Sequence, residues 1–237
     1  MKIVVYRNTG DIDIEFQDSH KHTVKHTSYI NFKSGNITNP FDITVYGVGC
    51  FGVGKHKSSY EKGIVYAGYK TWADMLKRCY RTKYKDMYPA YYNIATVCDE
   101  WHCYQIFADW YEENKYEVDE RLHIDKDILF PGNKLYEPEK CLLVPQRINM
   151  LFSNKKNKQG LPNGINRTKN GRYHVLYNKN NLGTYTNIED AIKIYSYAKE
   201  SAIKSIAQEY RKIIPEKLYI ALLEYRVDVK ADKNFVA

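Results

Sequence analysis

The first third of the chain alternates hydrophobic and polar positions as β-strands do. Ile12, Ile14 and Phe16 stand between acidic residues, and a short apolar run, residues 3–6, precedes them. A period of two predicts half-buried strands, and the segment 8–10 (Asn-Thr-Gly) between the two runs is typical of a hairpin turn. We therefore expect a small β-rich N-terminal module over residues 1–63.

The middle of the chain changes to helical spacing and then to a mixed pattern. Apolar positions recur every three or four residues in two stretches, and their members are Trp72, Met75, Leu76 and Cys79, then Trp101, Phe107 and Trp110. These positions predict two helices whose aromatic faces belong to a core. The runs 122–124 and 141–144 predict two strands, and Pro145 suits the start of a helix at Gln146. The second predicted domain covers residues 64–157.

The last eighty residues predict a three-stranded sheet packed on a long helix. Strands are expected at about 164–168, 172–178 and 182–185, with a type I′ turn at Asn170-Gly171. Thr186 and Glu189 form a capping-box pattern at the start of the helix. This third domain covers residues 158–237, and the whole chain is expected to be an α+β protein.

Positive charge is concentrated in one segment of the chain. The net charge is +8, yet residues 140–188 contain no Asp or Glu and carry +9. The cations of this basic segment are Lys140, Arg147, Lys155, Lys156, Lys158, Arg167, Lys169, Arg172 and Lys179. Such a block indicates a polyanion-binding site; the alternative is a solvated basic face with no role in nucleic-acid binding.

Several function classes are disfavoured by composition. No run of eighteen apolar residues exists, so no membrane span or membrane partner is expected. The N-terminus lacks the apolar region of a secretory signal. The five cysteines form no CxxC pair, and their odd number favours reduced thiols. We therefore expect a cytoplasmic protein.

The basic hairpin carries the first family resemblance. A sheet covered by one helix has an open face, and we expect that face to carry Arg167, Lys169, Arg172, His174, Tyr177 and Lys179. The stretch 161–210 resembles the AP2 (integrase-type) DNA-binding domain in its opening Gly-Ile, its basic hairpin, its Leu-Gly-Thr-Tyr strand and its Ala-rich helix.

The AP2 resemblance implies how the sheet would bind duplex DNA. The sheet would lie in the major groove, with Arg167, Arg172 and Tyr177 reading bases and Lys169 and Lys179 holding phosphates. Further DNA contacts are expected from two lysines of the preceding linker, Lys155 and Lys156.

A second resemblance covers the middle of the chain. His123-Ile124-Asp125, the stretch 138–145 (PEKCLLVP) and Asn149 resemble the ββα core of HNH nucleases, which phage and mobile-element proteins often join to an AP2-like tail. Cys141 takes the place of the family's central Asn, and Leu122 stands where active members have an Asp or His.

The HNH resemblance implies a metal-dependent phosphodiesterase. His123 would be the general base, and Asp125, Asp127 and Asn149 would surround Mg²⁺ or Mn²⁺. The alternative is a degenerate core that only binds. The sequence thus favours a DNA endonuclease of homing or HNH type, acting in a bacterial host cell if phage-encoded.

Two other functions use the same scaffold. One is a catalytically inactive DNA-binding regulator. The other is a phage protein that acts on a host defence system through protein contacts, for which residues 99–127, with ten carboxylates against three basic residues, would be the partner surface.

Overall fold

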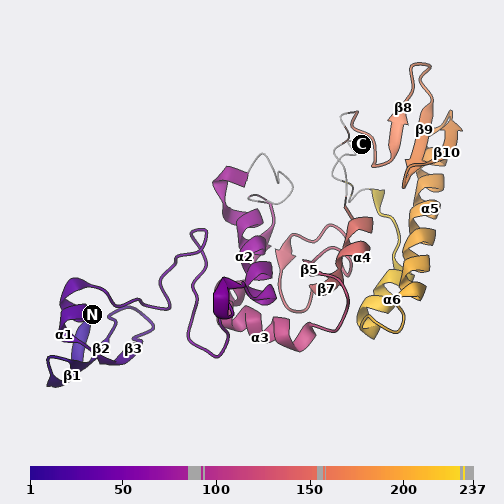
Figure 1. Cartoon of the computed structure of the whole chain (residues 1–237). Helices are drawn as coiled ribbons and strands as arrows, with labels where there is room; N and C mark the ends of the chain where they lie inside the picture. Colours follow the sequence, from indigo (N-terminus) through magenta and orange to yellow (C-terminus); the bar gives the residue numbers. More distant parts are fainter. Residues whose placement is uncertain (85–91, 93, 154–156, 158, 230–231, 233–237) are drawn as a thin grey trace. The chain divides into compact units, whose positions relative to one another are not determined.

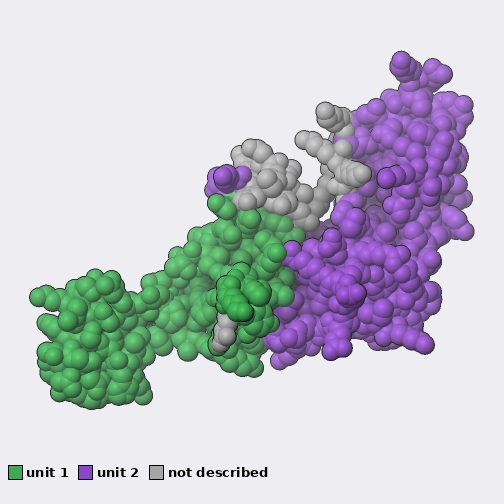
Figure 2. Space-filling view, viewed as in Figure 1, with its two compact units in different colours: residues 1–81, 99–109 green, residues 82–98, 110–237 purple. Residues whose placement is uncertain are grey.

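The computed structural model describes residues 1–84, 92, 94–153, 157, 159–229 and 232, and it confirms a mixed α+β protein (Figure 1). The chain forms two compact units (Figure 2): unit 1 contains residues 1–81 and 99–109, and unit 2 contains residues 82–98 and 110–237. The predicted boundaries near residues 63 and 157 stay a prediction. Within the described ranges, every helix is too short or too polar to cross a membrane.

Unit 1 begins with the predicted β-rich module. Strands β1 (Lys2–Asn8), β2 (Asp11–Glu15) and β3 (Thr23–Thr27) form an antiparallel sheet in the order β1-β2-β3, followed by the short helix α1 (Tyr29–Ser34). Ile12 and Ile14 are fully buried, as the alternation predicts. Asp13 is buried as well, which the alternation does not predict, because it forms an ion pair with Arg7.

The helical part of unit 1 is built on aromatic side chains. Helix α2 (Ala67–Tyr80) buries its predicted apolar face, including Trp72. The indole nitrogen of Trp72 donates to the Trp101 carbonyl oxygen at 2.7 Å, inside the 3₁₀ helix η3 (Asp99–His102). Helix α3 (Tyr104–Asn114) follows and continues into unit 2 at Trp110. The predicted second helix therefore begins after Trp101, and the core role of its aromatic residues is confirmed. Unit 1 also contains the 3₁₀ turn η1 (Glu61–Gly63), and the turn η2 (Thr82–Tyr84) belongs to unit 2.

Unit 2 contains a strand–strand–helix arrangement. Strand β5 (Leu122–Asp125) pairs antiparallel with β7 (Leu142–Pro145), and helix α4 (Gln146–Leu151) packs on both. Pro145 precedes the first helical residue, as predicted. A second pair, β4 (Thr96–Val97) and β6 (Leu135–Tyr136), is parallel.

The C-terminal sheet of unit 2 forms as predicted, but its turns differ. Strands β8 (Ile165–Arg167), β9 (Tyr173–Tyr177) and β10 (Asn180–Tyr185) lie in the order β10-β9-β8. The expected type I′ turn at Asn170-Gly171 is not formed, because only Gly171 has a positive φ. The β8–β9 connection is instead a longer loop, in which the Thr168 amide donates to the Arg172 carbonyl oxygen. The type I′ turn lies instead at Asn178-Lys179, where both φ angles are positive.

Helix α5 (Ile188–Glu209) packs on two different partners. Its first half, with Ala191 and Tyr195, covers the sheet, while its second half, with Ile203 and Ile206, packs with α4, β7 and helix α6 (Glu216–Glu224). Asn187 caps the helix by accepting from the Glu189 amide at 2.8 Å, so the predicted cap at Thr186 is wrong by one residue. One continuous helix thus joins the sheet to the strand–strand–helix core (Figure 1).

Side chains before β8 protect the outer edge of the sheet. The Asn157 amide donates to the Ile165 carbonyl oxygen at 2.8 Å. Gln159 accepts from the Arg167 amide at 2.7 Å and donates to the Arg167 carbonyl oxygen at 3.5 Å. These amides satisfy backbone groups that an edge strand leaves open to pairing with another chain.

Candidate nucleic-acid interface

The register of the C-terminal sheet decides which side chains point away from α5. Ile165 and Val175 are paired, fully buried and packed against the helix, so they mark the covered face. Residues two positions along a strand share a face, which places the paired Arg167 and Tyr173, and also Tyr177, on the covered side. The expected position of Arg167 and Tyr177 on the open face is therefore wrong, although their role in DNA contact stays a prediction.

Arg167 and Tyr177 have different surroundings on the covered side. The guanidinium of Arg167 lies over the Tyr173 ring, 5.4 Å from its centroid, and donates to the Tyr173 hydroxyl at 3.0 Å while remaining exposed. Tyr177 packs edge-on against Tyr195 with ring centroids 5.7 Å apart, and burial raises its pKa. Arg167 thus remains available to a ligand at the rim of the sheet, whereas Tyr177 is half-buried and held in place by Tyr195.

The open face carries Arg172 and His174. His174 follows Tyr173 by one residue in β9, so it points to the opposite side of the strand. Arg172 lies directly before the strand, and we infer the same side for it from the continuing alternation. The Arg172 guanidinium donates to the Thr184 carbonyl oxygen at 2.9 Å, which fixes its direction across β10. His174 Nε2 lies 3.1 Å from the Asn181 amide oxygen.

The two predicted phosphate ligands lie at opposite ends of β9. Lys169 is in the β8–β9 loop and Lys179 is in the β9–β10 turn, and both are exposed. A five-residue strand spans roughly 15 Å. Two cations at this separation contact different phosphate groups rather than one.

The cations of the basic segment divide into paired and unpaired groups. Lys140 pairs with Glu137 at 2.6 Å, and Arg147 pairs with Glu209. Within the described chain, the four cations of the sheet have no carboxylate within salt-bridge distance, and they are Arg167, Lys169, Arg172 and Lys179. The other three, Lys155, Lys156 and Lys158, lie outside the described residues.

The predicted nuclease residues occupy the β5–β7–α4 region without forming a metal site. His123 and Asp125 share one face of β5. The Asp125 carboxylate accepts from the amides of Asp127 and Ile128, both at 2.8 Å, and its pKa is raised by burial and by the Asp127 charge. Asp127 in turn pairs with the buried Lys126 at 2.8 Å. Both carboxylates therefore stabilise the loop after β5.

The remaining predicted positions are also shielded. His123 Nε2 is a buried atom, and Asn149 is half-buried on α4. Cys141 is buried, and burial raises the pKa of its thiol, so this thiol is a poor metal ligand. His123, Asp125 and Asp127 are not among the described donors that converge within 4.8 Å. These residues, as arranged, do not fit Mg²⁺ or Mn²⁺ coordination.

The acidic segment 99–127 is divided between the two units, and many of its carboxylates have internal partners. Asp109 lies 2.8 Å from His56 Nε2 in unit 1, and the imidazole lowers the pKa of that carboxyl. In unit 2, Glu120 accepts from the Arg147 amide at 2.8 Å and from the Tyr210 hydroxyl. A protein partner at this segment stays a prediction.

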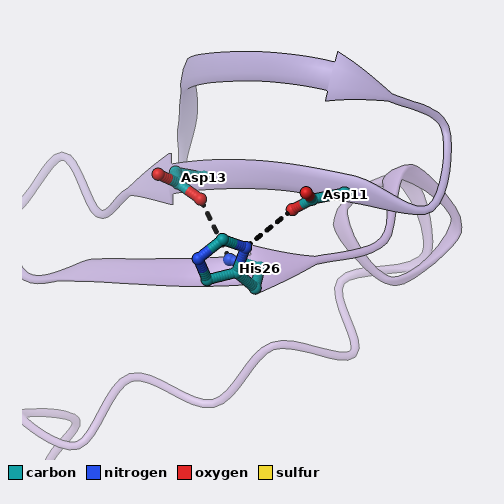
Figure 3. A group of neighbouring side chains, drawn as sticks. All are labelled: Asp11, Asp13 and His26. Carbon is teal, nitrogen blue, oxygen red and sulfur yellow. Dashed lines mark hydrogen bonds and ion pairs between the residues drawn. The ribbon is translucent and has the colours of Figure 1, made fainter.

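A group that sequence reasoning missed is formed by Asp11 and Asp13 on β2 and His26 on β3 (Figure 3). Their donor atoms lie within 4.8 Å of one another. Arg7 donates to both carboxylates at 2.8–2.9 Å and supplies the positive charge that a metal ion would otherwise provide. The Asp-Ile-Asp spacing puts both carboxylates on one strand, but nothing in the sequence pairs that strand with His26.

Acid should destabilise this N-terminal module through Asp13. Arg7 lowers the pKa of Asp13 from its ordinary 3.8 to about 2, so the carboxylate stabilises the fold above its ordinary pKa and loses that contribution as the pH falls toward 2. We expect the thermal midpoint to fall between pH 4 and pH 2, and to fall less in Asp13→Asn. Differential scanning calorimetry checks this; identical pH profiles for the two proteins would contradict it.

Comparison with known proteins leaves both resemblances as hypotheses. No protein-family model matches the chain, and neither curated proteins nor solved structures give a match. Function therefore has to be argued from the charges and contacts of the described residues.

Proposed function

We propose that the protein binds duplex DNA through the sheet β8–β9–β10. The observation that carries this proposal is that four cations gather on one small sheet with no carboxylate partner among the described residues. Uncompensated positive charge on a folded surface attracts the phosphate backbone and releases its counterions on binding. Lys140 and Arg147, in contrast, are neutralised by neighbouring carboxylates and contribute less.

The open face of the sheet determines how bases would be read. Arg172 is the strongest candidate, because it lies on that face and its guanidinium is held in one direction by Thr184. An arginine so placed matches the two acceptors of guanine in the major groove. Lys169 and Lys179 at the two ends of β9 would hold phosphates and set the position of the sheet. Arg167 would contact the backbone from the rim.

Equilibrium binding of the full-length protein to labelled duplex DNA tests this proposal. Fluorescence anisotropy across a salt series should show log affinity falling linearly with log salt concentration, because each bound phosphate releases counterions. An absence of binding at low ionic strength would rule the proposal out. Binding without salt dependence would rule out the sheet cations as its cause.

Metal-dependent DNA cleavage is a second candidate. The observation in its favour is the order of β5, β7 and α4, with His123 and Asp125 on one face of β5 and Asn149 on the packed helix. The poor convergence of the carboxylates argues for DNA binding without hydrolysis, which is the function of a regulator.

A nicking assay on supercoiled plasmid with Mg²⁺ or Mn²⁺ separates the two functions. We expect no cleavage by the wild-type protein under conditions in which it binds the plasmid. Cleavage that disappears in His123→Ala, with DNA affinity unchanged, would establish the nuclease and refute the inactive regulator.

A further inference from the structure

A groove of about 1160 Å³, with both polar and apolar side chains on its wall, lies in unit 2 between the C-terminal sheet and the region where α4 meets α5. Five primary amides stand on its described wall, and they are Asn157, Gln159, Asn163, Asn166 and Asn178. Tyr177, Lys179, Arg147 and Ser205 also line it. The packing of α5 against both the sheet and α4 holds the two walls of this groove together.

The groove continues from the surface that we propose to bind duplex DNA. Asn166 pairs with His174 and therefore shares the open face of the sheet. Lys179 in the β9–β10 turn belongs to both the sheet and the groove wall. At its far end the groove reaches Arg147, whose charge is compensated by Glu209.

The wall chemistry suits nucleobases better than a phosphate backbone. Arg147 is paired, so Lys179 is the one cation on the described wall without a carboxylate partner. The amides of Asn166 and Asn178, in contrast, offer donors and an acceptor to base edges. The amides of Asn157 and Gln159 on the same wall are bonded to the backbone around β8. Tyr177 adds a half-buried aromatic ring whose orientation is fixed by its contact with Tyr195, and such rings stack on bases of any sequence.

We propose that this groove receives unpaired nucleotides beside the duplex held by the sheet. Unpaired bases expose ring faces and the edges that pairing conceals, and amides and aromatic rings recognise both. The preferred substrate is then a duplex with a single-stranded extension rather than a blunt duplex. This inference rests on the duplex binding proposed above.

Replacement of Ser205 by tryptophan tests the inference by filling the groove. Ser205 is exposed on α5 and lines the groove, whereas Ser201 is exposed one turn earlier and is not part of the described wall. Ser201→Trp is therefore a matched control for the same change on the same helix. Anisotropy would compare a blunt duplex with the same duplex bearing a short single-stranded extension, for the full-length protein.

We expect the wild type and Ser201→Trp to bind the extended duplex roughly tenfold more tightly than the blunt duplex. Ser205→Trp should lose this preference and keep the wild-type affinity for the blunt duplex. Equal wild-type affinity for both DNAs would overturn the groove inference and leave duplex binding intact. A preference that persists in Ser205→Trp would overturn it as well. Absence of binding to either DNA would refute the proposed function itself. Thermal unfolding verifies folding, and Ser205→Leu replaces the tryptophan variant if that one misfolds.

Discussion

Replacing Lys169 and Lys179 by glutamine is expected to reduce the slope of log affinity against log salt by about 2 and to weaken binding to all duplexes alike. Both lysines are exposed, lie at opposite ends of β9 and have no carboxylate partner in the described chain. Each would neutralise its own phosphate, so each loss removes about one released counterion. A salt series with wild type and the double variant measures the difference.

Arg172 should respond differently from the two lysines. Its side chain lies on the open face, and Arg172→Ala should cost about 1–3 kcal/mol on a preferred sequence and much less on random DNA. Comparison of selected and random duplexes distinguishes base reading from backbone contact.

The matched control for the lysine pair lies on the helical side of the same unit. Lys193 and Lys212 are exposed cations outside the basic segment, and changing both to glutamine alters the net charge by the same amount. Their loss should leave the salt slope nearly unchanged. If this control weakens binding as much as the Lys169/Lys179 pair, net charge rather than the sheet is responsible.

Local patterning was sufficient to predict most elements of the fold. The alternation around Ile12 and Ile14 specified β2, and the helical spacing of Trp72 and Met75 specified α2, since burial of one face follows directly from the period. The turn between β8 and β9 was predicted less well. Asn170-Gly171 favours a tight type I′ turn, but the register of the two strands leaves a longer loop between them.

The candidate site was harder to predict, because it depends on which face of each strand the helix covers. The basic segment could be located from the sequence alone. The predicted position of Tyr177 on the open face was wrong, because the strand register puts Tyr177 against Tyr195. Long-range pairs were not foreseeable either. Asp125 binds the backbone of its own loop, and Arg7 reaches Asp13 across the ladder, and neither follows from sequence spacing.

Substitution of Gly164 by alanine is expected to destabilise unit 2 by roughly 2–5 kcal/mol. Gly164 has φ +78°, and a Cβ there would lie 2.3 Å from the Tyr195 ring and 2.5 Å from the Leu176 carbonyl oxygen. The carbonyl is part of β9 and is close to the hydrogen bond from the Leu176 amide to the Gly164 carbonyl oxygen at 2.8 Å, so it has little freedom to move. Urea unfolding followed by circular dichroism measures the loss.

Gly171→Ala separates crowding from backbone strain. Gly171 has φ +75°, and no atom of the described chain lies within 4 Å of its would-be Cβ, so alanine there introduces only the strain of a positive φ, about 1 kcal/mol. The excess loss in Gly164→Ala then measures the close approach of the backbone directly before β8 to Tyr195. Equal losses in the two variants would mean that α5 yields easily at this point. A larger loss of unfolding free energy at Gly164 would show that the sheet, the groove wall and α5 are tightly packed together at this point. It would also explain why a glycine is needed in the Gly-Ile pair that opens the stretch resembling the AP2 domain.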